Sequence, residues 1–413
     1  LLDKAARELG IDRVALRKIN APGNGGKDAK YGPKQGPVTS AYLKEALEKG
    51  AKQFDWDKRS KYSGKRVGNK VKAIGVGQAY HTAGYNGFDG LCRITPDGIL
   101  HIHTGVGNLG TFSYASTSRV CAEVLGYDWE RCVIERGGTR KHIPFNIGQF
   151  GSNTTFTMSR TNYAAGMAAK ELLLEIAAKS LGGKSEDYKL ENEFVVSISN
   201  GSNKISFADC AKKAVEMGGK YSGMETPEDI NPFTKAAVGG IKGTGLVGVA
   251  KDKIPKTAAV PALSASFIEI ELDLETGKYQ ILDYLGVADC GTVMHPTGLA
   301  AQIRGGAVMG FGLAATERHV YDPAYGRPNI RGLYQVKPPT YLDVPADLGW
   351  AAVDEADPQN PVGAKGIGEP LQGSASSALL CAISEALGGH MFNRTPVVTD
   401  MIINAAAGKP QSH

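Results

Sequence analysis

The hydrophobic positions of this chain follow two patterns, and the change between them falls near Val71. Before Val71, apolar residues recur at helical spacing, and Gly10-Ile11-Asp12 gives a stop and a restart signal. This spacing predicts helices over residues 1–9, 14–19 and 41–54. Residues 21–40, rich in glycine, proline and lysine, predict a loop, and the charged residues 58–72 predict an extended linker.

After Val71 the chain alternates between short strand-like runs and helical spacing, with clear turn signals such as Pro96-Asp97-Gly98. Strands are predicted over residues 73–78, 91–94, 98–104, 193–199, 265–273 and 280–288. Helices are predicted over residues 112–125, 163–181, 299–316 and 374–387. Hairpins with interspersed helices favour an α+β fold over a strictly alternating parallel α/β domain.

The distribution of charge separates the first 72 residues from the rest. They hold 18 Lys and Arg against 8 Asp and Glu, a net charge of +10, while the whole chain carries only +5. This basic helical segment is either a solvated face or a docking surface for an acidic partner or a phosphate-bearing ligand. Because the chain opens inside a predicted helix, the segment is expected to continue from an upstream half. Residues 73–413 are expected to form one domain, or two subdomains over 73–260 and 261–413.

Composition excludes several classes of protein. The net charge is too small to indicate nucleic acid binding, and the apolar run 305–315 is about half the length of a membrane span, so it predicts a buried helix. Six cysteines without any C-x-x-C argue against an iron–sulfur or zinc site within this chain and favour a reduced, cytoplasmic environment, with the periplasm left open. His101 and His103 share a strand face, where a surface or packing role is expected.

Gly105-Val106-Gly107-Asn108-Leu109-Gly110 matches the Gly-x-Gly-x-x-Gly pattern of dinucleotide-binding loops. Glycine fills 53 of 413 positions, so about one such match is expected by chance, and a second one exists at 243–248. The strand before the first loop reads His101-Ile102-His103 and follows a hairpin turn, whereas a dinucleotide fold needs an apolar parallel strand. Asp128 is the available acidic residue. A nicotinamide-dependent dehydrogenase using Gly105–Gly110 therefore stays as the alternative.

A second glycine-rich stretch, residues 362–371, leads into the last long predicted helix, which Pro370 can begin. Glu369 lies directly before this proline. It is either a carboxylate favoured by the helix dipole or a general base beside a bound cofactor, and the residues alone leave both open.

Gly363-Ala364-Lys365-Gly366-Ile367-Gly368-Glu369-Pro370 strongly resembles the signature of the molybdenum-binding subunit in the xanthine dehydrogenase and aldehyde oxidase family. Other segments resemble family elements in the expected order: residues 2–12 with Leu16-Arg17-Lys18-Ile19-Asn20, the pterin-contacting segment on 104–112, the Ser/Thr-rich loop on 151–155, and Asp289-Cys290-Gly291 followed by Pro296 and Gln302. The family's glutamate and glutamine in the pterin segment fall on Asn108 and Thr111.

The resemblance implies an α+β molybdopterin-binding domain in which Glu369 is the general base. It also implies the cofactor-binding residues Gly110, Thr111, Phe112, Gly151, Ser152, Asn153, Thr154, Thr155, Gln302, Lys365, Gly366, Ile367 and Gly368. No protein side chain is expected to bind the metal, because the pterin holds it. The implied reaction oxidises a C–H bond of an aldehyde or N-heteroaromatic substrate with water-derived oxygen.

The resemblance covers about the C-terminal half of a family subunit and therefore implies partner chains. These are the upstream half of the molybdenum subunit, an iron–sulfur subunit and a flavin subunit carrying FAD. The cofactor is molybdopterin with molybdenum, in its mononucleotide or its cytosine dinucleotide form. A non-catalytic structural subunit is a further alternative, to which the Thr111 departure lends weight.

Overall fold

The computed structural model describes residues 1–23, 30–31 and 36–410. They form two compact units. Unit 1 comprises Leu1–Thr82, Ala258–Glu355 and Ile367–His413, and unit 2 comprises Ala83–Thr257 and Ala356–Gly366. The chain crosses between the units after Thr82, Thr257, Glu355 and Gly366. Residues 24–29 and 32–35 of the expected 21–40 loop lie outside the described residues.

Unit 1 is built on a five-stranded sheet in the order β14-β13-β12-β4-β3. Its strands are β3 (Lys65–Val67), β4 (Lys70–Thr82), β12 (Pro261–Asp273), β13 (Tyr279–Asp289) and β14 (Gly349–Ala352). The pairs are antiparallel except β13 with β14. Thr82 at the end of β4 pairs with Pro261 at the start of β12. The chain therefore leaves this sheet and returns to it at neighbouring positions, and residues 83–257 in between belong to unit 2.

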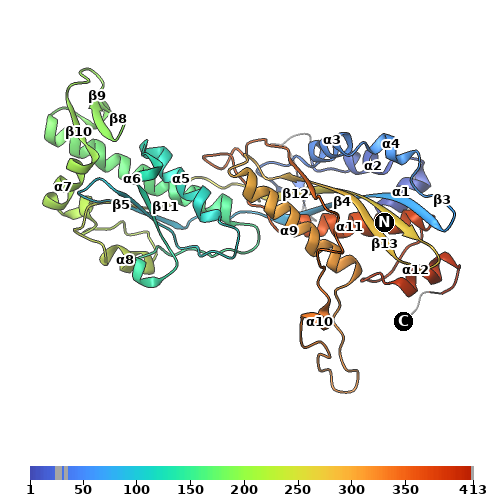
Figure 1. Ribbon diagram of the computed structural model, residues 1–413. Coiled ribbons are helices and arrows are strands. Elements are labelled where there is room, and N and C mark those ends of the chain that lie inside the picture. Colours follow the sequence, from blue (N-terminus) through green and yellow to red (C-terminus); the bar gives the residue numbers. More distant parts are fainter. Residues whose placement is uncertain (24–29, 32–35, 411–413) are drawn as a thin grey trace. The chain divides into compact units, whose positions relative to one another are not determined.

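Helices cover both faces of this sheet (Figure 1). On one face lie α2 (Arg13–Ile19), α3 (Leu43–Gln53) and α4 (Trp56–Ser60), around a core that includes Phe54, Trp56 and Phe267. On the other face lie α9 (Pro296–Ala315), α11 (Pro370–Ala386) and α12 (Thr399–Ala406), whose core includes Phe311 and Leu379. The remaining elements of unit 1 are α1 (Leu2–Leu9), β1 (Lys30–Tyr31), β2 (Gly36–Pro37) and α10 (Leu333–Val336).

The first two helices follow their sequence signals closely. Asp12 caps α2 by accepting hydrogen bonds from the backbone N–H groups of Val14 (2.8 Å) and Ala15 (2.9 Å). Its second oxygen accepts one from Trp56 Nε1 at 2.9 Å. Asp3 forms a buried ion pair with Arg17 at 2.7 Å. Burial raises the pKa of the Asp3 carboxyl, whereas the guanidinium groups of Arg17 and Arg13 lower it, and the net shift is downward. The N-terminal motif is therefore part of the scaffold.

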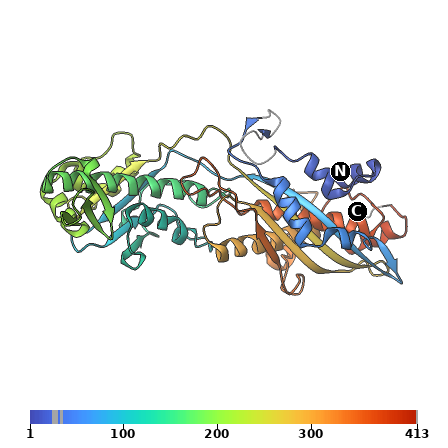
Figure 2. The same cartoon turned by 90° about the horizontal axis from the view of Figure 1, so that it is seen from above.

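Unit 2 contains two sheets. The larger has the order β11-β5-β6-β7, with β5 (Asp89–Ile94), β6 (Leu100–His103), β7 (Cys132–Glu135) and β11 (Leu246–Lys251). The smaller consists of β8 (Tyr188–Glu191), β9 (Phe194–Ser197) and β10 (Lys204–Ser206). Its helices are α5 (Ser113–Leu125), α6 (Thr154–Leu181), α7 (Phe207–Met217) and α8 (Pro232–Gly239). The long green helix of Figure 2 is α6, which packs on β5 and β11 in the main core of this unit.

The α+β fold class is confirmed, and most predicted elements are present. Two predictions were wrong. Residues 58–72 are not an extended linker, because they contain the end of α4, strand β3 and the start of β4. Helix α6 begins at Thr154, well before residue 163, because its polar first turns are buried by tertiary contacts. Among the described residues, no helix combines the length and apolar character that a membrane span requires.

Candidate functional site

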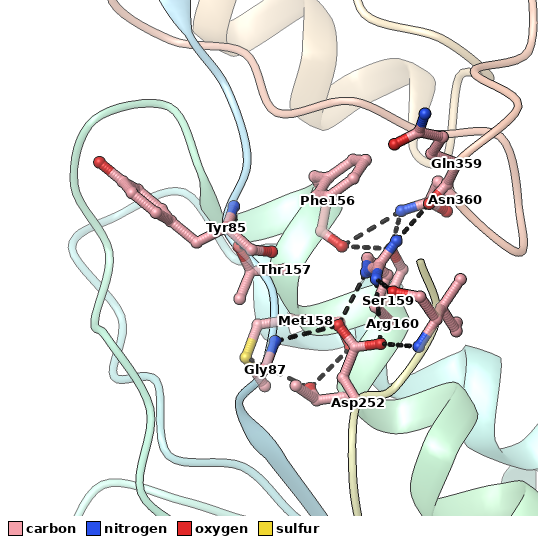
Figure 3. Close-up of polar contacts among 12 residues, drawn as sticks. Tyr85, Gly87, Phe156, Thr157, Met158, Ser159, Arg160, Asp252, Gln359 and Asn360 are labelled. Carbon is pink, nitrogen blue, oxygen red and sulfur yellow. Dashed lines mark hydrogen bonds and ion pairs between the residues drawn. The ribbon is translucent and has the colours of Figure 1, made fainter. Parts of the chain in front are cut away.

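The segment that carries the glycine signature is anchored within unit 2 by Arg160 of α6. Its guanidinium group is fully buried and binds both oxygens of Asp252, with Nε to Oδ2 at 2.7 Å and Nη2 to Oδ1 at 3.1 Å. It also donates to the backbone carbonyls of Ile254 and Gln359 (Figure 3). One side chain thus joins α6, the segment after β11 and the segment before the signature.

Asn360 makes the second connection. Its side-chain Nδ2 donates to the carbonyl of Phe156 at 3.1 Å and to Ser159 Oγ at 2.8 Å, both on α6. Its Oδ1 accepts from the backbone N–H groups of Val362 at 3.0 Å and Ala364 at 3.4 Å. The buried amide thus binds α6 through its nitrogen and the loop backbone through its oxygen. These bonds hold the loop before Lys365 against the first turns of α6 (Figure 3).

Two predicted cofactor segments meet at Gly366. Its N–H donates to the carbonyl of Ala83 at 3.1 Å. A Cβ at this position would lie 1.5 Å from the carbonyl oxygen of Ser152, which no side chain can accommodate. The structure therefore brings the Gly151–Thr155 loop against Lys365 and Gly366. The side chain of Lys365 is among the largest that are fully buried.

The Gly151–Thr155 loop has a tight backbone, with positive φ angles at Gly151 (59°) and Ser152 (51°). Thr154 and Thr155 are the first residues of α6, and the side chain of Asn153 makes no capping bond to this helix. Instead its Nδ2 donates backward to carbonyls of residues 148 and 150, while its buried Oδ1 has no partner among the described residues. The loop thus presents a helix N-terminus and an unpaired buried acceptor.

The Gly105–Gly110 loop connects β6 to α5. Asn108 Oδ1 accepts from the N–H groups of Gly110 at 3.0 Å and Phe112 at 3.2 Å. Phe112 has a φ of 53°, in the left-handed region, and its ring is 61% exposed. The side chain of Gln149, which sequence reasoning missed, forms hydrogen bonds to Leu109 and Thr111 and to Ser113 at the start of α5.

Strand β6 and Asp128 differ from the strand and the carboxylate that a dinucleotide-binding loop requires. Strand β6 pairs antiparallel with β5 and parallel with β7, so the hairpin prediction is confirmed. Of the surface and packing roles expected for the histidines of this strand, packing applies to His103, which is 2% exposed. Asp128 caps a short helical turn before β7, rather than following a strand as a ribose-binding carboxylate would. In the second match, residues 246–248 lie in strand β11.

The histidines of β6 face a charged cluster. His101 Nδ1 lies 3.1 Å from Glu135 Oε1, a carboxylate neighbour that the sequence did not reveal. His103 Nδ1 lies 3.0 Å from the carbonyl of Lys141. Burial lowers the pKa of His103 to about 4. A neutral, buried imidazole fits the predicted packing role. Within the described ranges, no group of three or more His, Cys, Asp or Glu side chains could hold a metal ion.

The other predicted site residues belong to unit 1: Gln302 lies in the second turn of α9, and Ile367, Gly368 and Glu369 directly precede α11, which runs beside α9 in the same direction. A Cβ on Gly306 of α9 would lie 3.4 Å from the carbonyl oxygen of Gly368, and one on Gly310 would lie 2.5 Å from that of Gln372. Gln302 is half-buried and lies one turn before Gly306 on α9.

Glu369 is half-buried at the N-cap position of α11, directly before Pro370. Its side chain makes no capping hydrogen bond to this helix. The first turn of α11 is held from below, because Ser264 Oγ of β12 donates to the carbonyl of Pro370 at 2.9 Å. Asp289, at the end of β13, accepts from the N–H of Tyr42 at 2.8 Å and so supports the start of α3.

The predicted residues thus fall into two groups. Unit 2 holds Gly110, Thr111, Phe112, Gly151–Thr155, Lys365 and Gly366, and unit 1 holds Gln302, Ile367, Gly368 and Glu369. Sequence reasoning missed Gln149, Arg160, Asp252 and Asn360. Asn360 could have been found as a turn signal, since it precedes Pro361. The pairing of Arg160 with Asp252 could not be found in the same way, because the two residues are 92 positions apart and no local sequence pattern marks either of them.

Comparison with known proteins agrees with this geometry. Residues 49–345 match the family model described as the molybdopterin cofactor-binding domain, and the chain belongs to this family. It is 27% identical over 397 residues to the xanthine dehydrogenase molybdenum-binding subunit of Escherichia coli O157:H7, covering 94% of this chain and 49% of that protein. It is 25% identical over 430 residues to the nicotine 6-hydroxylase large subunit of Paenarthrobacter nicotinovorans, covering 99% and 49%.

Solved structures show the same fold. The CO dehydrogenase from Oligotropha carboxidovorans matches with a TM-score of 0.78 and 18% identity, over 98% of this chain and 50% of that chain. The quinoline 2-oxidoreductase from Pseudomonas putida 86 matches with a TM-score of 0.77 and 22% identity, over 99% and 51%. The chain spans about half the length of the relatives it matches. The chain thus contains a molybdopterin cofactor-binding domain and is similar, over about half of their length, to molybdenum-binding subunits such as that of xanthine dehydrogenase.

Proposed function

We propose that this chain supplies the cofactor-holding loops and the general base of a molybdenum hydroxylase. The observation that carries the proposal is the backbone packing of Gly366 on Ser152, which joins two segments that the family resemblance assigns to the cofactor. Glu369 follows three residues later in the same segment. Its position at the start of α11 favours a negative charge.

The residues of unit 2 fit an organic ligand that carries both phosphate and many polar ring atoms. The N-terminus of α6, the hydroxyls of Thr154 and Thr155 and the tight backbone at Ser152 suit a phosphate. The buried Oδ1 of Asn153 and the buried Nδ2 of Asn146 have no partners in the described part of the chain. Unpaired buried amide atoms of both polarities suit pterin ring atoms, which both donate and accept hydrogen bonds.

Within the proposal, each group of residues has its own task. Gly110, Thr111, Phe112, Gly151–Thr155, Lys365 and Gly366 hold the cofactor through backbone and polar side-chain contacts. Gln302 orients the ligand with its amide, and Ile367 and Gly368 provide the backbone that leads to the base. Glu369 would accept the proton that the water-derived oxygen loses, through either carboxylate oxygen. When bound, the molybdenum cofactor supplies the redox chemistry.

The proposed reaction oxidises a C–H bond of an N-heteroaromatic or aldehyde substrate, with oxygen derived from water. Relatives whose names specify xanthine, nicotine or quinoline support the N-heteroaromatic class, and the aldehyde oxidoreductase subunit of Escherichia coli supports the aldehyde class. Since this chain spans about half of such subunits, the proposal includes the other half as a partner. It also includes an iron–sulfur subunit and a flavin subunit with FAD, because electrons must leave the site.

The first experiment is metal and pterin analysis of the protein purified with the chains that accompany it. We expect molybdenum and pterin in equal amounts, together with the visible absorption of iron–sulfur and flavin groups. Copurified nicotinamide without molybdenum would support the dehydrogenase alternative. Analysis of the nucleotide released from the pterin distinguishes the mononucleotide form from the cytosine dinucleotide form.

The second experiment is Glu369→Gln in the loaded complex. The amide keeps the size of the side chain but cannot accept the proton, so kcat should fall by about 10²–10⁴-fold while molybdenum and pterin contents stay unchanged. Glu123→Gln is the matched control, because Glu123 is an exposed glutamate on α5. Unchanged turnover in the Glu369→Gln complex would contradict the assigned base. A loaded wild-type complex without turnover on any substrate of these classes would favour a structural subunit.

A further inference from the structure

The amide of Gln149 is fully engaged with the loop that precedes α5. Its Oε1 accepts from the N–H of Leu109 at 2.8 Å, and its Nε2 donates to Thr111 Oγ1 at 3.0 Å and to Ser113 Oγ at 2.5 Å. Both Nε2 hydrogens and one acceptor site of Oε1 are therefore used, all within residues 109–113, at the end of the loop and the start of α5. Gln149 reaches this loop from the segment before Gly151.

The loop is packed at its start, where Val106 is 1% exposed, but it has few other supports further along. Leu109 is 75% exposed, and a Cβ on Gly107 or Gly110 would meet nothing within 4 Å. Apart from Gln149, its side-chain bonds are local ones, made by Asn108 to Gly110 and Phe112 and by Thr111 to Ser113. Because a loop with little packing orders only when long-range bonds outweigh its conformational entropy, Gln149 is the main long-range polar tie.

The direction of these hydrogen bonds also matters. An amide Nε2 can only donate, so the Thr111 and Ser113 oxygens accept from Gln149. The Thr111 hydroxyl donates in turn to Ser113 Oγ at 3.3 Å, so Ser113 Oγ accepts from both Gln149 and Thr111. The hydroxyl hydrogen of Ser113 then points away from both, toward any ligand beside the loop. A carboxylate at position 149 would reverse this, because it accepts from hydroxyls instead.

We propose that Gln149 is a positioning residue for the cofactor: it links the Gly151–Thr155 loop to residues 109–113 and, together with Thr111, orients the hydroxyl of Ser113 as a donor to the pterin. This inference rests on the proposed function, which assigns Thr111 to the cofactor. The amide of Gln149 acts through Thr111 and Ser113. It therefore compensates for the short side chain at position 111 by fixing where the hydroxyl of Ser113 points.

The test compares Gln149→Ala and Gln149→Glu with wild type in the complex as purified. One readout is the pterin and molybdenum content after dialysis, and the other is amide hydrogen exchange at Leu109, which needs no cofactor. In Gln149→Ala the bond to the Leu109 N–H is lost, so its exchange should accelerate about five- to tenfold and cofactor retention should fall by a similar factor. In Gln149→Glu the acceptor remains, so exchange at Leu109 should stay slow while cofactor retention falls.

Asn200→Ala is the matched control, because Asn200 also accepts a backbone N–H in a turn of unit 2, that of Ser202 at 3.1 Å. It should leave both readouts unchanged. Equal cofactor retention in wild type and both Gln149 variants would overturn the inference. So would parallel loss of slow exchange and cofactor in Gln149→Glu, since that shows a role in loop folding alone. A wild-type complex without pterin would instead contradict the proposed function, and the two failures are therefore distinguishable.

Discussion

Arg160 and Asp252 form a two-point ion pair in the interior of unit 2, with N–O distances of 2.7 and 3.1 Å and side chains that are 0% and 1% exposed. The two residues are distant in sequence, on α6 and directly after β11. Only the tertiary fold of unit 2 brings them into contact. The same guanidinium binds two carbonyls, one of them in the segment that leads to Lys365.

Asp252→Asn should therefore be strongly destabilising, because it leaves the Arg160 charge buried without a counterion. We expect a loss of about 3–5 kcal/mol in the free energy of unfolding. The double variant Arg160→Met/Asp252→Leu removes both charges and should recover a large part of this loss. Urea denaturation followed by fluorescence gives both values. A single variant as stable as wild type would show that the pair is not a structural anchor.

Gly366→Ala should abolish retention of the cofactor. The added Cβ would lie 1.5 Å from the carbonyl oxygen of Ser152, so one of the two loops must move. Gly201→Ala is the matched control, because Gly201 lies in another turn of unit 2 and a Cβ there meets nothing within 4 Å. The measurement is pterin content per chain after gel filtration. The prediction is wrong if the two variants retain equal amounts.

His103 should make the stability of unit 2 depend on pH. Burial lowers its pKa to about 4, with smaller effects from Arg93, Glu135 and His101, while the unfolded chain titrates near 6.5. Between these values the unfolded state binds more protons, so stability falls as the pH decreases from about 6.5 to 4. Between pH 7.5 and 5 the loss attributable to this group is about 2 kcal/mol.

His103→Gln should flatten that dependence, whatever it does to stability at neutral pH. Urea unfolding at several pH values, compared as wild type minus variant, isolates the contribution of His103. His319→Gln, at an exposed position, is the control and should leave the slope as in wild type. A slope that His103→Gln does not change would mean that the imidazole is not buried in its neutral form.

Phe112→Gly should stabilise the protein slightly. Phe112 has a φ of 53°, which costs a residue with a Cβ about 1–2 kcal/mol, whereas glycine adopts this angle freely. Greater freedom of glycine in the unfolded chain reduces the gain to about 0.5–1 kcal/mol. Phe112→Ala keeps the Cβ and should show no such gain. The midpoints of urea denaturation of the three proteins decide between them.

Much of the fold could be predicted where local signals are strong. The Gly10-Ile11-Asp12 restart appears as the end of α1 and the Asp12 cap of α2, and the apolar run 305–315 lies inside α9. Residues 58–72 were misjudged because their order comes from pairing with distant partners: β3 pairs with β4, which in turn pairs with β12. No periodicity of charged residues reveals such pairing.

The candidate site shows the same limit. The glycine signature could be placed before α11 from sequence, because Pro370 marks the helix start. The start of α6 could not, since its first turns are polar residues that tertiary contacts bury, such as Asn162, which donates to the carbonyl of Thr117 at 3.0 Å. Gln149 was missed for a related reason: a half-buried glutamine in a loop looks ordinary until its three partners are seen together.

The pairing of Thr82 with Pro261 sets the order in which this polypeptide can assemble. On the ribosome, β4 emerges first and must wait for β12 until the whole of residues 83–257 has been made. The strands of unit 2 can pair in the meantime, since β5, β6, β7 and β11 all lie within that insertion. The central sheet of unit 1 is therefore the late, high-contact-order step of folding, and it is the step that a chaperone would have to protect.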